Sequence, residues 1–351
     1  MSKLNRPSGV FVSNGEIFIG DEHNHRVRKV LRNGQIVTIA GTGTEGYNGD
    51  DQLATNAQLC CPISVTVSSS NQVYILEKSH RIRKIDRHGI ISTIVGTGEK
   101  GYNGDDQLAV SAQLNSPLGL FVTEDEEVLI ADTNNHRVRK IDRNGIISTI
   151  AGNGNGGFNG DGQLAKSASL SNPTSVFQYK TEIYIADINN YRIRKMDRNG
   201  VISTITINGA YISPDTIFVY NDEVYFTDGL FQLLKTQRNG TVSAIAGIDD
   251  DLGFNGDDML ATECNLNFPT GIFIDSDSQV YIADSYNHCI RRIDQNGMMR
   301  RVVGTAGEKG YSGDVPFDFG MYPHIGPRKK SAIKPFPQAY HDLIVMHETI
   351  S

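Results

Sequence analysis

One stretch of the sequence decides the fold: residues 131–145 read ADTNNHRVRKIDRNG. Similar versions occupy residues 20–34, 77–89, 186–200 and 283–297, and a diverged copy runs from Thr227 to Gly240. Six copies of one unit indicate a repeat protein, in which each copy is one supersecondary element that buries its apolar faces against its neighbours. The chain is therefore interpreted unit by unit.

Each unit opens with a proline and a short apolar strand, and proline suits the first residue of a strand because it lacks an N–H group. The opening prolines are Pro7, Pro62, Pro117, Pro173, Pro214 and Pro269. A tight turn leads to a second strand rich in β-branched and aromatic residues, such as residues 280–282. The repeated stretch then supplies a loop, which we call the signature loop, and a third strand rich in Arg and Lys. An Asn-Gly pair follows, as in Asn144-Gly145, and predicts a type I′ hairpin into the fourth strand.

Four antiparallel strands that are apolar on both faces form a blade that packs between like blades, so the sequence predicts an all-β, six-bladed β-propeller. A linear β-solenoid fits poorly, because solenoid repeats are usually shorter and lack Asn-Gly hairpins. We expect the propeller to span residues 6–304, with residues 305–351 forming a tail or the beginning of a further segment. The expected blades are approximately 7–41, 62–96, 117–152, 173–206, 214–247 and 269–304.

A second repeated motif, which we call the insert, lies between most blades. Residues 46–59 read GYNGDDQLATNAQL, and related copies begin at Gly101, Gly157, Gly253 and, in part, Gly310. The link before Pro214 lacks it, which makes the fifth unit the degenerate one. Asp50 followed by helix-forming residues predicts a short N-capped helix in each insert, with Leu53 and Ala57 on one face.

Composition narrows the function classes. The formal net charge of −7 argues against a nucleic-acid or anionic-membrane binder that depends on charge. The four cysteines form no disulfide framework, and no apolar run approaches the length of a membrane span. We therefore expect reduced thiols, a cytoplasmic location, no membrane association and a monomer.

The signature loops resemble the NHL repeat family. Asn24-His25, Asn135-His136 and Asn287-His288 each follow an aspartate, although the Leu that gives the family its third letter is replaced by Arg or Cys. The long form with the insert looks like the NHL propellers of teneurins. The resemblance implies a six-bladed propeller but little chemistry, since NHL relatives include protein-interaction modules, RNA-binding propellers, receptor-kinase sensor domains and an amidating lyase.

In such a blade the signature loop and the link to the next blade share one face, which we call the insert-bearing face. Aromatic and adaptable polar side chains gathered there suit a protein or peptide partner. The candidate binding residues are Tyr47, Asp50, Tyr102, Asp105, Phe158, Asp161, Phe254, Asp257, His25, His136 and His288. The competing interpretation is that each aromatic residue fixes its own insert and each aspartate is a cap.

A further set is assigned a structural role, because guanidinium–carboxylate pairs within or between blades would neutralise the basic strand. This set consists of Asp21, Asp132, Asp187, Asp284, Arg28, Arg83, Arg139, Arg194 and Arg291. If those arginines were free, they would instead form a basic surface for RNA, which is the alternative function.

We expect no catalytic residues, no cofactor and no metal site. The histidines lie on different blades, too far apart to share one ion, and the Asp-rich inserts lack the spaced acidic ladder of calcium loops. At the mouth of the central channel the first-strand residues are small or apolar, with one acid, Asp215. A metal-dependent lyase or hydrolase of the propeller type is the second alternative, although neither of the residue sets that such relatives need is present.

Overall fold

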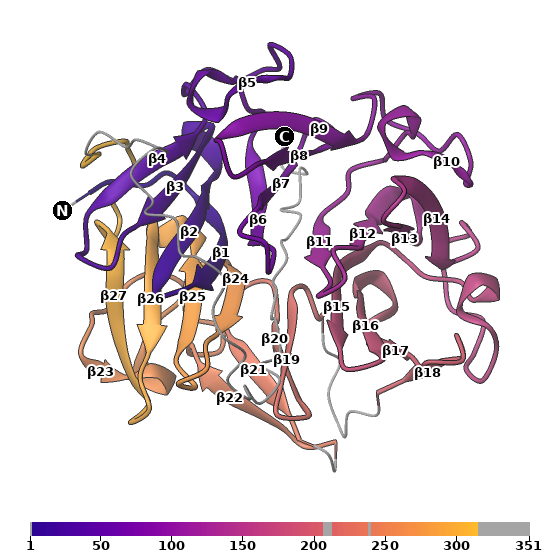
Figure 1. Ribbon diagram of the computed structural model, residues 1–351. Helices are drawn as coiled ribbons and strands as arrows, with labels where there is room; N and C mark the ends of the chain where they lie inside the picture. Colours follow the sequence, from indigo (N-terminus) through magenta and orange to yellow (C-terminus); the bar gives the residue numbers. More distant parts are fainter. Residues whose placement is uncertain (1, 206–212, 238–239, 315–351) are drawn as a thin grey trace, which may run out of the picture.

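The computed structural model describes residues 2–205, 213–237 and 240–314. Six antiparallel sheets of four or five strands surround a central axis (Figure 1). In every blade the four main strands follow chain order from the axis outwards, and in blades two, three and six a short insert strand pairs outside the fourth strand. The all-β, six-bladed propeller predicted from the repeats is confirmed.

The blades are defined by the following strands. Blade one contains β1 (Pro7–Ser13), β2 (Glu16–Asp21), β3 (Arg26–Val30) and β4 (Ile36–Ala40), and blade two contains β6 (Pro62–Val67), β7 (Val73–Glu77), β8 (Arg81–Ile85) and β9 (Ile90–Val95). Blade three contains β11 (Gly119–Val122), β12 (Val128–Asp132), β13 (Arg137–Ile141) and β14 (Ile146–Ala151), and blade four contains β15 (Pro173–Tyr179), β16 (Glu182–Asp187), β17 (Arg192–Met196) and β18 (Ile202–Thr204). Blade five contains β19 (Ile217–Tyr220), β20 (Glu223–Thr227), β21 (Leu233–Thr236) and β22 (Val242–Ala246), and blade six contains β24 (Pro269–Ile274), β25 (Val280–Asp284), β26 (Cys289–Ile293) and β27 (Met298–Gly304).

The ring is closed by its innermost strands. Each of β1, β6, β11, β15, β19 and β24 contacts the next, and β24 contacts β1. These strands are apolar on both faces because each is packed between two like strands; every residue of β6 and of β24 is buried. An open solenoid is thereby excluded.

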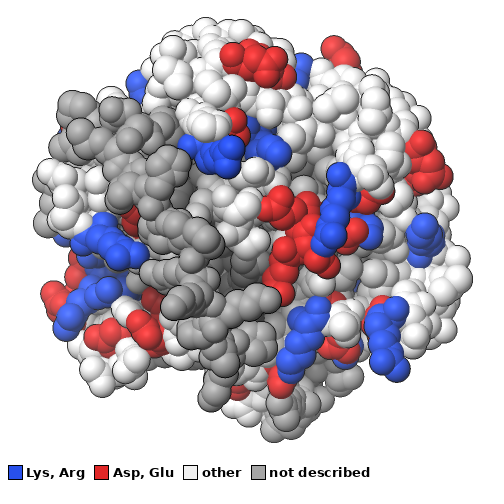
Figure 2. Space-filling view, viewed as in Figure 1, with Lys and Arg blue, Asp and Glu red and all other residues white. Residues whose placement is uncertain are grey.

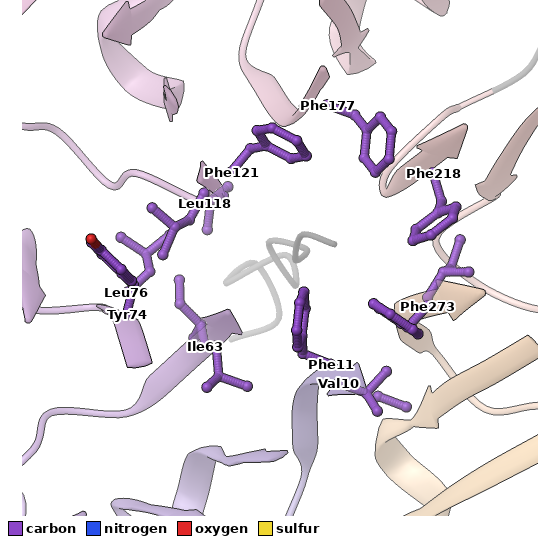
Figure 3. Close-up of a cluster of buried hydrophobic side chains, with 14 of the residues drawn as sticks. Val10, Phe11, Ile63, Tyr74, Leu76, Leu118, Phe121, Phe177, Phe218 and Phe273 are labelled. Carbon is purple, nitrogen blue, oxygen red and sulfur yellow. The ribbon is translucent and has the colours of Figure 1, made fainter. Parts of the chain in front are cut away.

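Phenylalanines pack together at the axis, at the fifth residue counted from each opening proline in five of the blades (Figure 3). Four ring contacts, with centroids 4.8 to 5.7 Å apart, link Phe11 to Phe273, Phe273 to Phe218, Phe218 to Phe177 and Phe177 to Phe121. Thr66 occupies the position in blade two. All five rings are at most 6% exposed, and the aromatic cluster lines this level of the hub with apolar contacts.

The hairpin between the third and fourth strands differs from the predicted type I′ turn. In blade three the N–H of Gly145 donates to the Asp142 carbonyl oxygen at 2.9 Å, and Gly145 has a positive φ of 76° while Asn144 does not. The Asp142 carboxylate accepts from the N–H groups of Asn144 and Ile146, both at 2.9 Å. Asp142 thus organises a type I turn, as Asp86, Asp197 and Asp294 do in blades two, four and six. A type I′ geometry occurs between the first and second strands, where Asn14 and Gly15 both have positive φ.

The predicted insert helices are absent from the described residues, which contain only one-turn 3-10 helices such as η2 (Ala54–Asn56) and η3 (Ala109–Ser111). Asp51 adopts a left-handed conformation with φ of 59°, which an α-helix does not tolerate. The next two residues form the short strand β5 (Gln52–Leu53), which pairs with the outer edge of blade two at β9. Backbone hydrogen bonds to an unpaired sheet edge therefore replace those of a helix. The inserts before blades three and six make the same pairing through β10 (Gln107–Leu108) and β23 (Met259–Leu260).

Each insert also joins two consecutive blades. The carbonyl oxygen of Ala109 accepts from Gly96 at the end of blade two, and the N–H of Ala109 donates to Gly145 of blade three, at 3.0 and 2.8 Å. The partial insert at Gly310 makes an equivalent link where the ring closes, because Asp314 forms an isolated β-bridge with Ile36 of blade one. The rest of the predicted tail, residues 315–351, lies outside the described residues, and the predicted domain boundaries stay a prediction. Within the described part of the chain, no helix is long and apolar enough to cross a membrane.

Candidate functional site

The signature loop places an aspartate, an asparagine and an arginine in one buried cluster. In blade three, Asp132 ends β12, Asn135 ends the 3-10 turn η4 (Thr133–Asn135), and Arg139 lies in the middle of β13. The Asn135 side-chain amide donates to the Asp132 carboxylate at 2.8 Å, and an Arg139 guanidinium nitrogen lies 3.4 Å from the same oxygen. Asp132 and Arg139 are fully buried, so the charge of each is balanced by the other and not by water.

The insert completes this cluster from outside the blade. The Asp105 carboxylate accepts from Arg139 at 2.8 Å and from the Thr149 hydroxyl at 3.1 Å. The Tyr102 ring lies under two guanidinium groups, 4.0 Å from Arg137 and 4.9 Å from Arg139, measured to the ring centroid. The Asn135 amide also donates to the Gly101 carbonyl oxygen at 2.7 Å. The aromatic residue and the aspartate of each insert therefore fix that insert to the following blade.

The same arrangement recurs around the ring. The insert carboxylate that meets the buried arginine is Asp50 for Arg83, Asp161 for Arg194, Asp257 for Arg291 and Asp314 for Arg28. The stacked ring is that of Tyr47, Phe158, Phe254 or Tyr311. The signature-loop partner of the arginine is Asp187, Asp284 or Asp21. Blade five has Leu234 at the arginine position of its third strand, and no insert precedes it.

Blade two departs from the pattern in its acid. Glu77 occupies the aspartate position, and its carboxylate lies 3.7 Å from Arg83, with a hydrogen bond from Ser79 at 2.8 Å. Burial raises the pKa of Glu77 to about 7, against the opposing effect of Arg83. The signature-loop aspartates are affected in the same direction: burial raises the pKa of Asp21, Asp132, Asp187 and Asp284 to about 6, although their hydrogen bonds and the buried arginines act to lower it.

The pKa of the insert aspartate is shifted in the opposite direction. Burial acts to raise the pKa of Asp105, but the Thr149 hydrogen bond, the charge of Arg139 and the Tyr102 hydroxyl together hold it below its ordinary value. Asp105 is consequently ionised at neutral pH and pairs with Arg139 as an anion.

The histidines that end the signature loops do not converge; each contacts the next blade. His136 Nδ1 accepts from the backbone N–H of Asn172 at 3.1 Å, and His80 Nδ1 accepts from that of Ser116 at 3.1 Å. His288 Nδ1 accepts from Arg6, which carries the contact from blade six to blade one, and His25 Nδ1 accepts from Cys61. An accepting Nδ1 requires a neutral ring, and burial lowers the pKa of all four imidazoles.

The structure therefore brings the candidate binding residues together as pairs of loop and insert, one pair at each junction, and gives most of them a packing role. They nevertheless retain exposed edges: the aromatic side chains of Tyr47, Tyr102, Phe158 and Phe254 are 37 to 41% exposed. Each insert adds a leucine that is 44 to 60% exposed, namely Leu53, Leu108, Leu164 and Leu260. The exposed leucines were missed from the sequence, because the predicted helix would have placed them against the blade.

The hub offers no acid–base pair among the described residues. Asp215 is fully buried, one of its carboxylate oxygens has no hydrogen-bond partner, and burial followed by the charge of Asp228 holds its pKa well above the ordinary range. The phenylalanine cluster was also missed from the sequence, although its spacing from the opening prolines could have revealed it.

A groove of about 710 Å³ opens between blades two and three. Its lining combines hairpin residues such as Ser69, Asp125 and Asp142 with insert residues Leu108, Ala109 and Val110, so it lies beside the second insert at the ends of the strands away from the signature loops. None of the candidate binding residues predicted from the sequence lines this groove, although the exposed Leu108 does. Figure 2 shows one face of the molecule, on which Lys and Arg side chains form separate groups, several of them beside acidic side chains.

Comparison with known proteins supports the repeat assignment. The model of the teneurin NHL domain matches residues 43–103 and 240–316, and that of the NHL repeat matches residues 4–30 and 114–141.

Two curated relatives illustrate the breadth of the similarity. The chain is 28% identical over 304 residues to Protein SUPPRESSOR OF QUENCHING 1, chloroplastic, of Arabidopsis thaliana, covering 84% of this chain and 25% of that protein. It is 26% identical over 314 residues to mouse Teneurin-4, covering 80% of this chain and 10% of that protein. The chain thus spans a quarter of the length of the first relative and a tenth of that of the second.

Solved structures share the fold at low identity. A streptogramin B lyase structure superposes with a TM-score of 0.56 at 13% identity, covering 90% of this chain and 85% of that one. A gluconolactonase from Xanthomonas campestris superposes with a TM-score of 0.54 at 13% identity, covering 80% of this chain and 83% of that one. At such identities the likeness concerns the fold alone.

Proposed function

Since the chain is a six-bladed propeller of teneurin-like NHL repeats, we propose that it is a non-catalytic binding module that engages a protein or peptide through its insert-bearing face. The observation that carries the proposal is the repeated presentation of two exposed apolar side chains by each complete insert. These are Tyr47 with Leu53, Tyr102 with Leu108, Phe158 with Leu164 and Phe254 with Leu260.

The inserts are suited to recognition because they are held rigidly before any partner arrives. In the second insert, Asp105, Tyr102 and the backbone of Ala109 are all fixed to neighbouring blades. A surface that is already ordered loses little conformational entropy on binding, so more of the contact energy appears as affinity. Exposed aromatic edges and leucines surrounded by polar groups are also the composition of protein interfaces.

The alternative of RNA binding is weakened by the state of the basic strand. Arg28, Arg83, Arg139, Arg194 and Arg291 are fully buried, and each faces carboxylates. Lys140 and Lys195, which follow in the same strands, pair with Glu127 and Glu182 at 2.8 Å. Phosphate binding needs cations that water and phosphate can reach.

The alternative of a lyase or hydrolase rests on structural neighbours that share only the fold. In this chain the hub is lined by Phe11, Phe121, Phe177, Phe218 and Phe273, which places apolar rings where a convergent set of polar side chains would be needed. The proposed module acts by binding and not by catalysis, as a monomer. The four cysteines are free thiols, and the cytoplasmic location expected from the sequence stays a prediction.

The proposal is tested with the full-length chain as bait. Partners captured by the wild type are identified, and capture is repeated with the combined Leu108→Ser and Leu164→Ser variant. The matched control is Leu230→Ser, because Leu230 is 43% exposed but belongs to blade five, outside any insert. We expect at least tenfold weaker binding of the identified partner to the double variant, unchanged binding to the control, and hydrogen-exchange protection of residues 101–111 and 157–167 in the complex. Equal binding by all three proteins, or protection of groove residues Ser69, Glu124 and Asp125 without protection of the two inserts, would refute the proposal.

A further inference from the structure

Three side chains that can ligate a metal meet where the first insert returns to the start of blade two. The carboxylate of Glu45 and the thiols of Cys60 and Cys61 have ligand atoms that all lie within 4.8 Å of one another. Cys60 Sγ is 3.4 Å from Glu45 Oε1. The insert folds back on itself to create this contact: the N–H of Gly46 donates to the Leu59 carbonyl oxygen at 3.3 Å, which brings the two ends of the insert together.

The architecture of the propeller does not require these side chains. The two residues before the opening proline act through their backbones: the first donates its N–H to the signature-loop acid, as Asn115 does to Asp132, and the second donates to the histidine of the preceding blade, as Ser116 does to His80. Cys60 and Cys61 perform the same two backbone tasks, toward Glu77 and His25. The corresponding pairs elsewhere are Asn5-Arg6, Asn115-Ser116, Ser171-Asn172 and Asn267-Phe268. In the last pair the N–H of Phe268 donates to the Leu230 carbonyl oxygen, because blade five has no signature-loop histidine.

The Glu45 carboxylate also has no counterpart in the other inserts. Counting back from the first glycine of each insert, Lys100 occupies the position of Glu45 in the second insert, Gly156 in the third, Leu252 in the fourth and Lys309 in the last. A side chain repeated at every junction is explained by the fold. Glu45, Cys60 and Cys61 each depart from the repeat and meet at one point, so the shared fold does not explain them. Two thiols and a carboxylate together are a common set of metal ligands.

Ligand chemistry favours zinc. Thiolate sulfur and carboxylate oxygen bind Zn²⁺ at about 2.3 Å and about 2.0–2.2 Å, so two ligand atoms on a tetrahedral ion lie about 3.5–3.8 Å apart. The distance from Cys60 Sγ to Glu45 Oε1 is close to such an edge already. Both thiols are partly exposed and free, so an ion has access to them. Three protein ligands leave a fourth position open to solvent.

We propose that Glu45, Cys60 and Cys61 form a Zn²⁺ site at the junction of blades one and two. The ion would tie the beginning of the first insert to the entry of blade two, and it would stabilise the folded chain because the three ligands are brought together only by folding. The sequence alone gave no indication of this site, since its ligands are not spaced along one element but come from the two ends of an insert. The site is independent of the proposed binding function.

The test uses the reduced full-length chain after removal of metal by a chelator. Zn²⁺ is titrated against a chromophoric competitor, and Cd²⁺ is added separately to observe the thiolate-to-metal absorption band. We expect one Zn²⁺ per chain, a Cd²⁺ band, and a rise in the unfolding temperature on addition of Zn²⁺.

Two variants use residues that other junctions already accommodate. The Cys60→Asn with Cys61→Ser variant reproduces the Asn115-Ser116 pair, and Glu45→Lys reproduces Lys100. The first should lose the Cd²⁺ band and stoichiometric Zn²⁺ binding, and the second should bind Zn²⁺ at least tenfold more weakly. Both should unfold at the wild-type temperature in the presence of chelator. The matched control, Glu99→Lys, changes a glutamate beside Lys100 on the next insert and should bind as the wild type does. The proposal is overturned if the wild type fails to bind Zn²⁺ stoichiometrically, or if the double cysteine variant binds it equally well.

Discussion

His136 Nδ1 accepts a hydrogen bond from the backbone N–H of Asn172, 36 residues further along the chain and on the next blade. His80, His288 and His25 make the same contact at their own junctions. The histidine that ends each of these signature loops therefore joins its blade to the next one. The predictions below follow from these junctions.

The histidine contacts predict a pH dependence of stability. Burial, followed by the charge of Arg137, lowers the pKa of His136 below the ordinary value of 6.5. At a pH between the lowered pKa of the folded state and 6.5, the unfolded chain binds more protons than the folded chain. The stabilisation by His136 is therefore complete above about pH 6.5 and is lost as the pH falls through the pKa of the folded state. The buried signature-loop aspartates act in the opposite sense, because their pKa of about 6 exceeds the value of 3.8 expected on unfolding, and they favour folding as the pH falls below 6.

Comparison with a variant isolates the histidine contribution. His136→Asn should destabilise the protein by about 1 kcal/mol at pH 7.5, where the hydrogen bond is intact in the wild type. This gap should narrow as the pH is lowered to 5, since only the wild type loses the imidazole contact by protonation. Urea unfolding of both proteins across the pH range measures the difference, and a gap independent of pH would contradict the assignment.

The buried ion pair at each junction predicts a large loss of stability when one partner is removed. Arg139→Met leaves the Asp132 carboxylate buried without its cation, and we expect a cost of about 3–5 kcal/mol in the free energy of unfolding. The control is Leu234→Met, because Leu234 holds the equivalent position in blade five, where no such pair exists. Denaturant titration distinguishes them; similar small losses for both variants would show that the pair contributes little.

A close backbone contact predicts that one glycine after the fourth strand is irreplaceable. Gly152 has a φ of 89°, and a Cβ atom there would lie 2.2 Å from the carbonyl oxygen of His136. Gly152→Ala therefore combines backbone strain with a clash that only movement of the signature loop can relieve, and we expect a loss of more than about 3 kcal/mol.

The turn glycine provides the matched control for that substitution. Gly145 also has a positive φ, of 76°, but a Cβ atom there would meet nothing within 4 Å. Gly145→Ala should therefore cost only about 1 kcal/mol, the price of a left-handed alanine. Thermal unfolding of the two variants should separate them clearly, and equal losses would mean that strain, and not the contact with His136, dominates.

Much of the fold was available in the sequence, because the information is local and repeated six times. The opening prolines, the strand pattern and the signature loop of residues 131–145 determine blades, their number and their order. The ion pairing of the basic strand was also anticipated, since Arg139 and Asp132 recur together. Errors arose where the outcome depended on a neighbour. The Asp50–Ala57 segment has helix-forming residues, yet its backbone pairs with the edge of β9, which the local sequence does not contain.

By itself, the sequence determined that this protein is a ring of six four-stranded blades, because propensity, alternation and turn chemistry act over a few residues and repetition multiplies the signal. Only the tertiary structure decided what the repeated side chains do. It buried Arg139 between two carboxylates, turned His136 toward the next blade, left Leu108 exposed, and brought Glu45 to Cys60 and Cys61. These relationships join residues from different blades or from the two ends of an insert, and their energies depend on burial and distance, which arise only once the ring has closed.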